Sequence, residues 1–158
     1  MAVDYFLKID GIEGESTDRG HENEIDVTSF SWGESNNSNV AHGGGGGAGR
    51  VSMQDFHFTM KVNKASPKLM LACASGRHFP RAVVTARKAG GDQQPIDYLK
   101  YSLTDILVSS YQTNADSDNG PVEQISLNFL KIEFAYTPQS LAGGPVLTTF
   151  DQTTNQGG

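Results

Sequence analysis

The sequence predicts a mainly β fold, either a barrel or a sandwich, with one helix attached. Several segments alternate apolar and polar residues, as a strand does when one of its faces is buried. Only residues 67–75 combine helical length with helix start and stop signals. The chain of 158 residues shows no internal repeat and no domain boundary, so we expect one domain over residues 1–158.

Six or seven strands are expected, separated by turn-forming Gly, Asn, Asp and Pro residues. Alternation or a continuous apolar face predicts strands over residues 3–9, 24–33, 52–62, 80–89, 98–111, 122–136 and, as a short final strand, 146–151. In the strand over 52–62, one face carries Phe56, Phe58, Met60 and Val62. The polar segment after residue 151 is expected to be a tail.

The second of these strands changes its pattern midway. Ile25 and Val27 share one face in its first half, whereas Phe30 and Trp32 fall on the other face in its second half. Such a change within one strand predicts a bulge or a bend near Ser29. The strand over 122–136 shifts its pattern in the same way.

The single helix is apolar around nearly its whole circumference. Ser66 is a candidate N-cap, Pro67 suits the first helical position and Gly76 suits the C-terminal cap. Between these signals only Lys68 and Ser75 are polar. A helix on the surface of a monomer should show one apolar stripe. We therefore expect this helix to bury one face in its own core and another against something else.

A long connection over residues 34–50 has no periodicity and contains five consecutive glycines. Structureless loops of this length inside compact domains usually have a function or are disordered. Gly44, Gly46 and Gly49 match the spacing of a dinucleotide-binding loop, but such loops follow a strand and open a helix, and here a strand follows. A phosphate-binding P-loop would also need Lys where the chain has Arg50. The glycine run therefore does not predict a nucleotide site.

Composition excludes several classes of partner. The net charge of −6, from 12 basic and 18 acidic residues, argues against nucleic acid as the main partner. The longest apolar run is too short to span a bilayer, so no membrane insertion is expected. A single cysteine, Cys73, excludes a disulfide framework and a multi-cysteine zinc site. No basic stretch precedes an apolar segment at the start, so no Sec signal peptide is expected.

No group of residues in the sequence predicts an enzyme. His21 and Glu24 fall in a polar loop without a second histidine at ligand spacing, and we expect them to be solvated loop charges. Asp116 and Asp118 look like the start of a calcium loop, but its twelfth position is Leu127 and not glutamate. We therefore expect no catalytic residue, no metal site and no cofactor.

Nine segments nevertheless share their order and spacing with one known family. These segments are residues 3–9, 14–16, 24–27, 31–33, 43–50, 66–70, 73–76, 87–91 and 107–110. Together they resemble the haemolysin-coregulated protein (Hcp) family, which supplies the inner tube of the bacterial type VI secretion system. The resemblance covers the chain from Met1 to about Pro138.

The resemblance implies a compact β-barrel of two sheets, with one helix on its side and an extended loop reaching an adjacent ring. Family members form hexameric rings that stack into a tube, and a contracting sheath expels the tube with its effectors. The implied partners are further copies of the chain, the contractile sheath, the spike protein and secreted effectors. The implied location is the bacterial cytoplasm, followed by secretion through the type VI apparatus.

Three groups of residues become candidates under this resemblance. The ring-stacking loop would contain Gly43, Gly44, Gly45, Gly46, Gly47, Gly49 and Arg50. The helix face against a neighbouring subunit would contain Lys68, Met70, Leu71 and Ala74. Alternation beyond the bend turns Ser29 and Ser31 away from the core, and the family's habit of carrying cargo suggests that they face the channel.

One departure and one alternative remain. Many relatives carry a Gly-Trp-containing C-terminal strand, whereas this chain has residues 148–151 and then a tail rich in Gln, Asn and Gly. The alternative function is a monomeric β-barrel that binds a small ligand, with the glycine loop as a lid. The mass in solution separates the two functions, since a ring has about six times the mass of a monomer.

Overall fold

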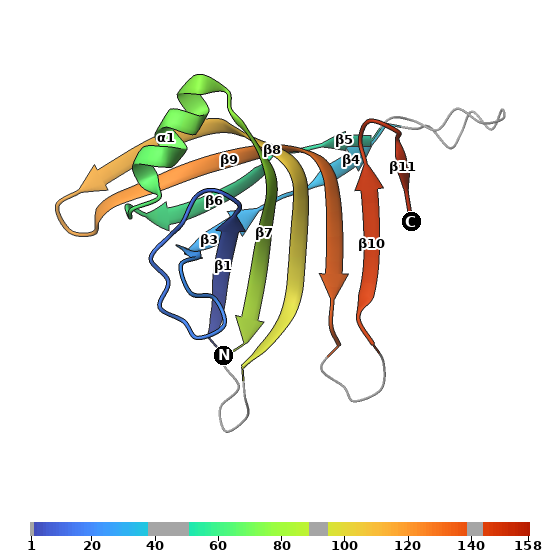
Figure 1. Cartoon of the computed structure of the whole chain (residues 1–158), viewed down its shortest axis with the longest axis horizontal. Helices are drawn as coiled ribbons and strands as arrows, with labels where there is room; N and C mark the ends of the chain where they lie inside the picture. Colours follow the sequence, from blue (N-terminus) through green and yellow to red (C-terminus); the bar gives the residue numbers. More distant parts are fainter. Residues whose placement is uncertain (1, 38–50, 89–94, 139–143) are drawn as a thin grey trace.

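The computed structural model describes residues 2–37, 51–88, 95–138 and 144–158 (Figure 1). This part of the chain forms one helix and eleven strands. They are β1 (Val3–Ile9), β2 (Ile25–Val27), β3 (Ser29–Ser31), β4 (Glu34–Asn36), β5 (Val51–Met53), β6 (Phe56–Lys61), α1 (Ser66–Ser75), β7 (His78–Lys88), β8 (Ile96–Asp116), β9 (Gly120–Tyr136), β10 (Val146–Asp151) and β11 (Gln156–Gly157). The expected mainly β fold with one helix is confirmed.

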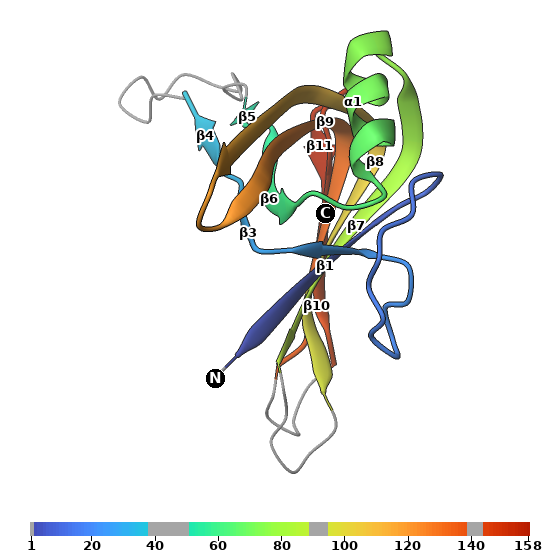
Figure 2. The ribbon, with the colours of Figure 1, turned by 90° about the vertical axis from the view of Figure 1, so that its left-hand side faces the viewer.

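Nine of these strands form a single antiparallel sheet. Its order is β11-β10-β9-β8-β7-β1-β2, while β6 pairs with the other end of β9 and β3 pairs with β6. The long β8–β9 hairpin bends over, so its two ends lie in different layers (Figures 1 and 2). One layer contains β10, β9, β8, β7, β1 and β2, and the other contains β3, β6, β9 and β8.

The hairpin bends where both of its strands change phase. Buried residues normally recur at every second position of a strand, but Leu103 is followed by Ile106 on β8, and Phe129 by Ile132 on β9. Between the β8 pair, Asp105 has a φ of 55°, which residues other than glycine rarely adopt. The change of phase predicted for the last long strand is confirmed.

A second bend lies at Thr28, one residue before the predicted position. The backbone N–H and the hydroxyl of Thr28 both donate to the carbonyl oxygen of Thr59, at 2.8 and 3.0 Å. Before this residue β2 pairs with β1, and after it β3 pairs with β6. The segment from β2 to β3 therefore contributes one strand to each of the two layers.

The expected barrel of two sheets is confirmed in its two layers, which one bent sheet forms, but the barrel does not close. Among the described residues, following the paired strands from β2 through β1, β7, β8, β9 and β6 leads to β3. No pairing in this part of the chain joins β3 back to β2, so the sheet stays open. These two strands are joined by the chain itself at Thr28. Because they follow one another along a single extended segment, they cannot pair side by side.

The core fills the space between the two layers, and α1 covers it from one side. Phe56, Phe58 and Met60 are buried as expected, whereas Val62, beyond the end of β6, is 45% exposed. The largest wholly buried side chains besides these come from every layer: Leu7, Ile25, Leu69, Leu103, Ile106, Ile125 and Leu127. Burial of this apolar set is the main source of stability.

The helix begins one residue earlier than expected, at Ser66. Ser66 is buried inside the first turn and is not the N-cap, which is Ala65 without a side-chain hydrogen bond. Instead, Oδ1 of Asn63 accepts from the backbone N–H of Ala65 at 2.8 Å. Gly76 ends the helix in the left-handed conformation at φ 66°, as predicted. No helix in the described segments is long and apolar enough to cross a membrane.

Two irregular segments contain more structure than expected. Residues 34–36 of the expected loop form β4, which pairs with β5 in a separate ribbon. Residues 38–50 lie outside the described part of the chain. The final strand β10 forms as expected. The segment after β10 was expected to be a polar tail, but Gln156 and Gly157 form a short strand, β11, that pairs with the end of β10.

Candidate functional site

The layer formed by β3, β6, β9 and β8 carries a set of polar side chains on its outward side, all of them at least partly exposed except Ser126, which is buried beneath its neighbours. Strand register places them in two rows across the four strands. One row is Ser31, His57, Ser126 and Ser110, and the other is Ser29, Thr59, Gln124 and Gln112. We call these eight residues the polar face. Ser29 and Ser31 are exposed and turn away from Phe30 and Trp32, as the alternation predicted.

The polar face forms a shallow hollow of about 480 Å³. Seven of its residues line the hollow, and His57 is the one ionisable side chain among the described residues that do so. Hydroxyl and amide groups both donate and accept hydrogen bonds. The arrangement can hold a polar polypeptide through many weak contacts, without selecting strongly for its charge.

A hydrogen-bond network stiffens one edge of the polar face. At a bulge in β8, the hydroxyl of Ser109 donates to Asp55 at 2.7 Å and lies 2.7 Å from the hydroxyl of Ser126. The other oxygen of Asp55 accepts from the amide of Asn128 at 2.9 Å. Within the described structure, Asp55 is thus held by hydroxyl and amide donors on one side of the polar face.

The outward face of α1 is a second candidate surface. The four predicted interface residues are all exposed: Lys68, Met70, Leu71 and Ala74. Met70 is 55% and Leu71 is 63% exposed, while Leu69 and Ala72 on the opposite face are buried. The expectation that the helix buries one face in its own core is confirmed. Two large apolar side chains remain in contact with solvent in the single chain.

The third candidate is the glycine loop. Gly43, Gly44, Gly45, Gly46, Gly47, Gly49 and Arg50 all lie outside the described residues. The β4–β5 ribbon marks only where the loop leaves and re-enters the described chain.

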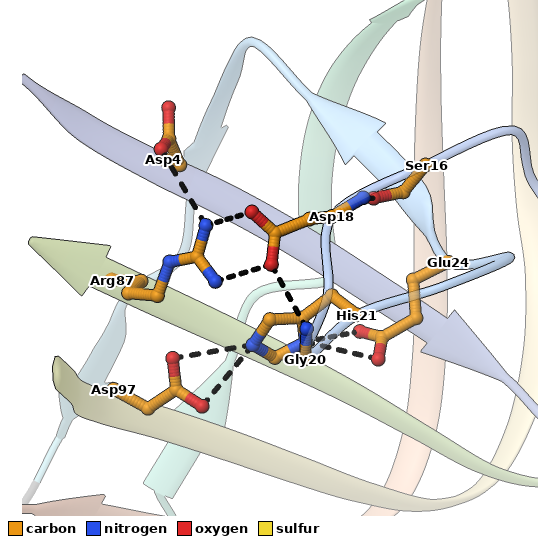
Figure 3. Close-up of polar contacts among 8 residues, drawn as sticks. All are labelled: Asp4, Ser16, Asp18, Gly20, His21, Glu24, Arg87 and Asp97. Atoms are coloured by element: carbon orange, nitrogen blue, oxygen red, sulfur yellow. Dashed lines mark hydrogen bonds and ion pairs between the residues drawn. The ribbon is translucent and has the colours of Figure 1, made fainter. Parts of the chain in front are cut away.

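The structure corrects the expectation for His21 and Glu24 (Figure 3). His21 is only 6% exposed, and its ring stacks on Phe6 with centroids 4.3 Å apart. Its Nδ1 lies 2.9 Å from both carboxylate oxygens of Glu24, and its Nε2 lies 3.1 and 3.2 Å from those of Asp97. His21 is therefore a buried imidazole held between partly buried Glu24 and exposed Asp97, and we call these three residues the His21 clamp. Sequence reasoning missed it because Asp97 is 76 residues away from His21.

An ion pair beside His21 holds the same loop (Figure 3). Arg87 donates to both carboxylate oxygens of Asp18, and its guanidinium lies over the ring of Phe6 at 5.0 Å. The hydrogen bonds from Arg87 lower the pKa of Asp18 to about 2, although burial opposes them. The backbone N–H of Gly20 also donates to Asp18, at 3.1 Å. The cluster fastens the loop before β2 onto β1, β7 and β8.

The described residues contain no group of three or more His, Cys, Asp or Glu side chains suited to a metal ion. Cys73 is half-buried against the core. Asp116 accepts hydrogen bonds from the backbone N–H groups of Asp118 and Asn119, at 2.9 and 2.6 Å, which is the geometry of a hairpin turn.

Comparison with known proteins identifies the family. Residues 6–136 match the family model described as "Type VI secretion system effector, Hcp". The chain is 46% identical over 151 residues to protein hcp1 of Pseudomonas aeruginosa, and the match covers 92% of this chain and 93% of that protein.

Solved structures agree with this match. The crystal structure of Hcp1 from Salmonella typhimurium has a TM-score of 0.81 at 36% identity, covering 99% of both chains. A structure described only as a type six secretion system protein has a TM-score of 0.89 at 30% identity, covering 99% of this chain and 100% of that one. With this sequence match and this shared fold, the chain belongs to the Hcp family of the type VI secretion system.

Proposed function

We propose that the chain is a structural subunit of the type VI inner tube. Six copies form a ring, the rings stack into a tube, and the contracting sheath expels the tube with the effectors that it carries. In this function the chain is not a catalyst. Its partners are further copies of itself, the sheath, the spike protein and the effectors.

The polar face is the observation that carries this proposal. It spans four strands and exposes hydroxyl, amide and imidazole groups instead of large apolar side chains. A channel wall made of such groups stays hydrated and leaves the bore open. Cargo is then held by many weak hydrogen bonds and by confinement, which permits release once the rings separate.

The exposed helix face supports the assembly part of the proposal. Met70 and Leu71 stay largely exposed in the single chain, and a neighbouring subunit in the ring would cover them. The glycine loop would contact the adjacent ring, where glycine allows a close backbone approach. The alternative, a monomer that binds a small ligand inside a barrel, has less support because the polar hollow lies on the outward face of its sheet.

A secretion assay tests this function. The chain, produced in a bacterium that has a type VI apparatus, should appear in the medium, and it should stay in the cell when the sheath is deleted. Removing residues 43–49 should leave rings intact, because no core residue is lost, but should abolish stacking and secretion. Secretion of the full chain without a sheath would contradict the proposed function.

A further inference from the structure

A small apolar pocket lies at the side of the molecule opposite the helix. Its volume is about 230 Å³, and it lies between β10, the β8–β9 sheet and the start of the β4–β5 ribbon. Its walls include Trp32, Met53, Tyr101, Phe134 and Phe150. In both views, α1 and the β4–β5 ribbon lie on opposite sides of the chain (Figures 1 and 2). We call this cavity the Trp32 pocket.

Trp32, in the wall of the pocket, carries a hydrogen-bond donor that is unpaired among the described residues. Nε1 of Trp32 is buried and has no hydrogen-bond partner within the described structure. A buried N–H without an acceptor is costly, and in native proteins it usually has a partner. This nitrogen is enclosed by the chain itself, so the pocket offers an incoming group mainly the apolar surfaces of its walls.

The opposite side of the chain carries side chains that match this pocket. Met70 and Leu71 project from α1 with 55% and 63% of their surface exposed. A pocket of about 230 Å³ has room for one or two aliphatic side chains of this size. Lys68 and Ser75 lie on the same side of the helix as Leu71, because residues three or four apart share a helix face.

Charge is complementary between the two surfaces. Lys68 is the one charged residue of α1, and Glu34 is the one charged residue among those that line the Trp32 pocket. Both are exposed, and neither forms an ion pair with another residue that the structure describes.

We propose that, in the ring, α1 of one subunit docks on the Trp32 pocket of the next subunit. Leu71 and Met70 fill the apolar cavity, and Lys68 pairs with Glu34 at its rim. This inference rests on the proposed ring assembly and adds which two surfaces meet. Because the two surfaces differ, the contact is head-to-tail, which a closed ring requires.

A charge exchange tests this contact. The variants Lys68→Glu and Glu34→Lys each place like charges at the contact, and each should weaken assembly roughly tenfold or more, since like charges at an interface repel. The double variant restores the opposite pair and should recover most of the rings. Size-exclusion chromatography with light scattering measures the ring fraction. Lys8→Glu, which changes an exposed lysine on β1, is the matched control and should assemble normally.

The outcomes separate this inference from the proposed function. If the wild-type chain forms rings and both single variants assemble equally well, the docking contact is wrong and the tube function stands. If the singles weaken assembly but the double variant does not recover, the helix meets another surface, such as the exposed apolar residues Tyr136, Val146 and Leu147. If the wild-type chain forms no ring, the proposed function itself fails.

Fluorescence gives a second test that does not depend on the charge variants. Trp32 is the only tryptophan of the chain, so its emission reports on this pocket alone. In wild-type rings its emission should be blue-shifted and less accessible to acrylamide than in a monomeric Leu71→Asp variant. Identical emission in ring and monomer would overturn the contact, because the pocket would then be empty in both or filled by the same chain.

Discussion

Ser66 and Glu123 form a hydrogen bond in the interior of the protein, in which the hydroxyl of Ser66 donates to Oε1 of the carboxylate. Glu123 is wholly buried on β9, and its second oxygen accepts from the hydroxyl of Thr113 at 3.3 Å. Ser66 is the first residue of α1. This pair therefore fixes the start of the helix that we assign to the subunit interface.

Replacing Glu123 should show how much its hydrogen bonds to Ser66 and Thr113 contribute to the stability of the fold. Glu123→Ala leaves the buried hydroxyl of Ser66 without its acceptor, removes the hydrogen bond from exposed Thr113 and opens a cavity, so the free energy of unfolding should fall by about 3 kcal/mol. Glu123→Gln keeps the volume and one acceptor oxygen and should cost less than about 1.5 kcal/mol. Urea unfolding followed by circular dichroism measures both values. Equal losses in the two variants would show that the hydrogen bonds contribute little.

The ion pair between Arg87 and Asp18 should make the free energy of unfolding depend on pH. The pKa of Asp18 is about 2 in the folded protein, below its ordinary value of 3.8. A lowered pKa stabilises the fold above about pH 4, and this contribution is lost as the pH falls from about 4 to about 2. Because the Asp18 side chain is 27% exposed, we expect about 1 to 2 kcal/mol.

The measurement compares unfolding free energies at pH 6 and near pH 3 for the wild type and Asp18→Asn. The difference between the two proteins should shrink as the pH falls through this range. Asp118→Asn, at an exposed aspartate in the β8–β9 turn, is the control and should show little pH-dependent difference. A constant Asp18→Asn penalty across the range would contradict the ion-pair account.

The His21 clamp should stabilise the loop that precedes β2, because its central imidazole is buried. His21→Ala removes hydrogen bonds to Glu24 and Asp97 and the stacking on Phe6, so it should cost about 1 to 3 kcal/mol and speed amide exchange over residues 14–24. His78→Ala is a matched control, since His78 also binds an aspartate, at 2.9 Å, but its side chain is 62% exposed. The control should cost no more than about 0.5 kcal/mol. Similar losses would mean that the burial of the His21 side chain does not matter for stability.

Enlarging Ser31 should affect cargo but not folding. Ser31 is exposed at the edge of the polar face and touches no core position, so Ser31→Gln should fold and form rings like the wild type. The longer side chain narrows the hollow and should reduce retention of a cognate effector in a pull-down. Ser35→Gln, at an exposed serine of β4, changes the same chemistry away from the polar face. Equal effector recovery from both variants would exclude Ser31 from the cargo surface.

Neighbouring residues in the sequence were enough to predict those elements that show regular alternation or carry a residue typical of an end. Alternation of apolar and polar residues predicted β1, the glycine at position 76 predicted the end of α1, and the change of alternation before Phe30 predicted the bend that lies at Thr28. The exposure of Ser29 and Ser31 followed from the same alternation.

Features that depend on distant partners could not be predicted in this way. The ribbon of β4 and β5 has only three residues on each side, too few to show a period. His21 is buried because Asp97 and Phe6 approach it, and Glu123 is buried because Ser66 and Thr113 do. In each case a polar residue looks solvated until the register of remote strands is known. The rows of the polar face depend on that register too.

The mass of the purified chain in solution tests the central claim most directly. Size-exclusion chromatography with light scattering should give a particle of about six times the chain mass of 17.0 kDa. A charge at Leu71 should convert this particle into a folded monomer, because an unpaired ion would be buried at the interface. A wild-type chain that remains a 17.0 kDa monomer at all concentrations would contradict the account.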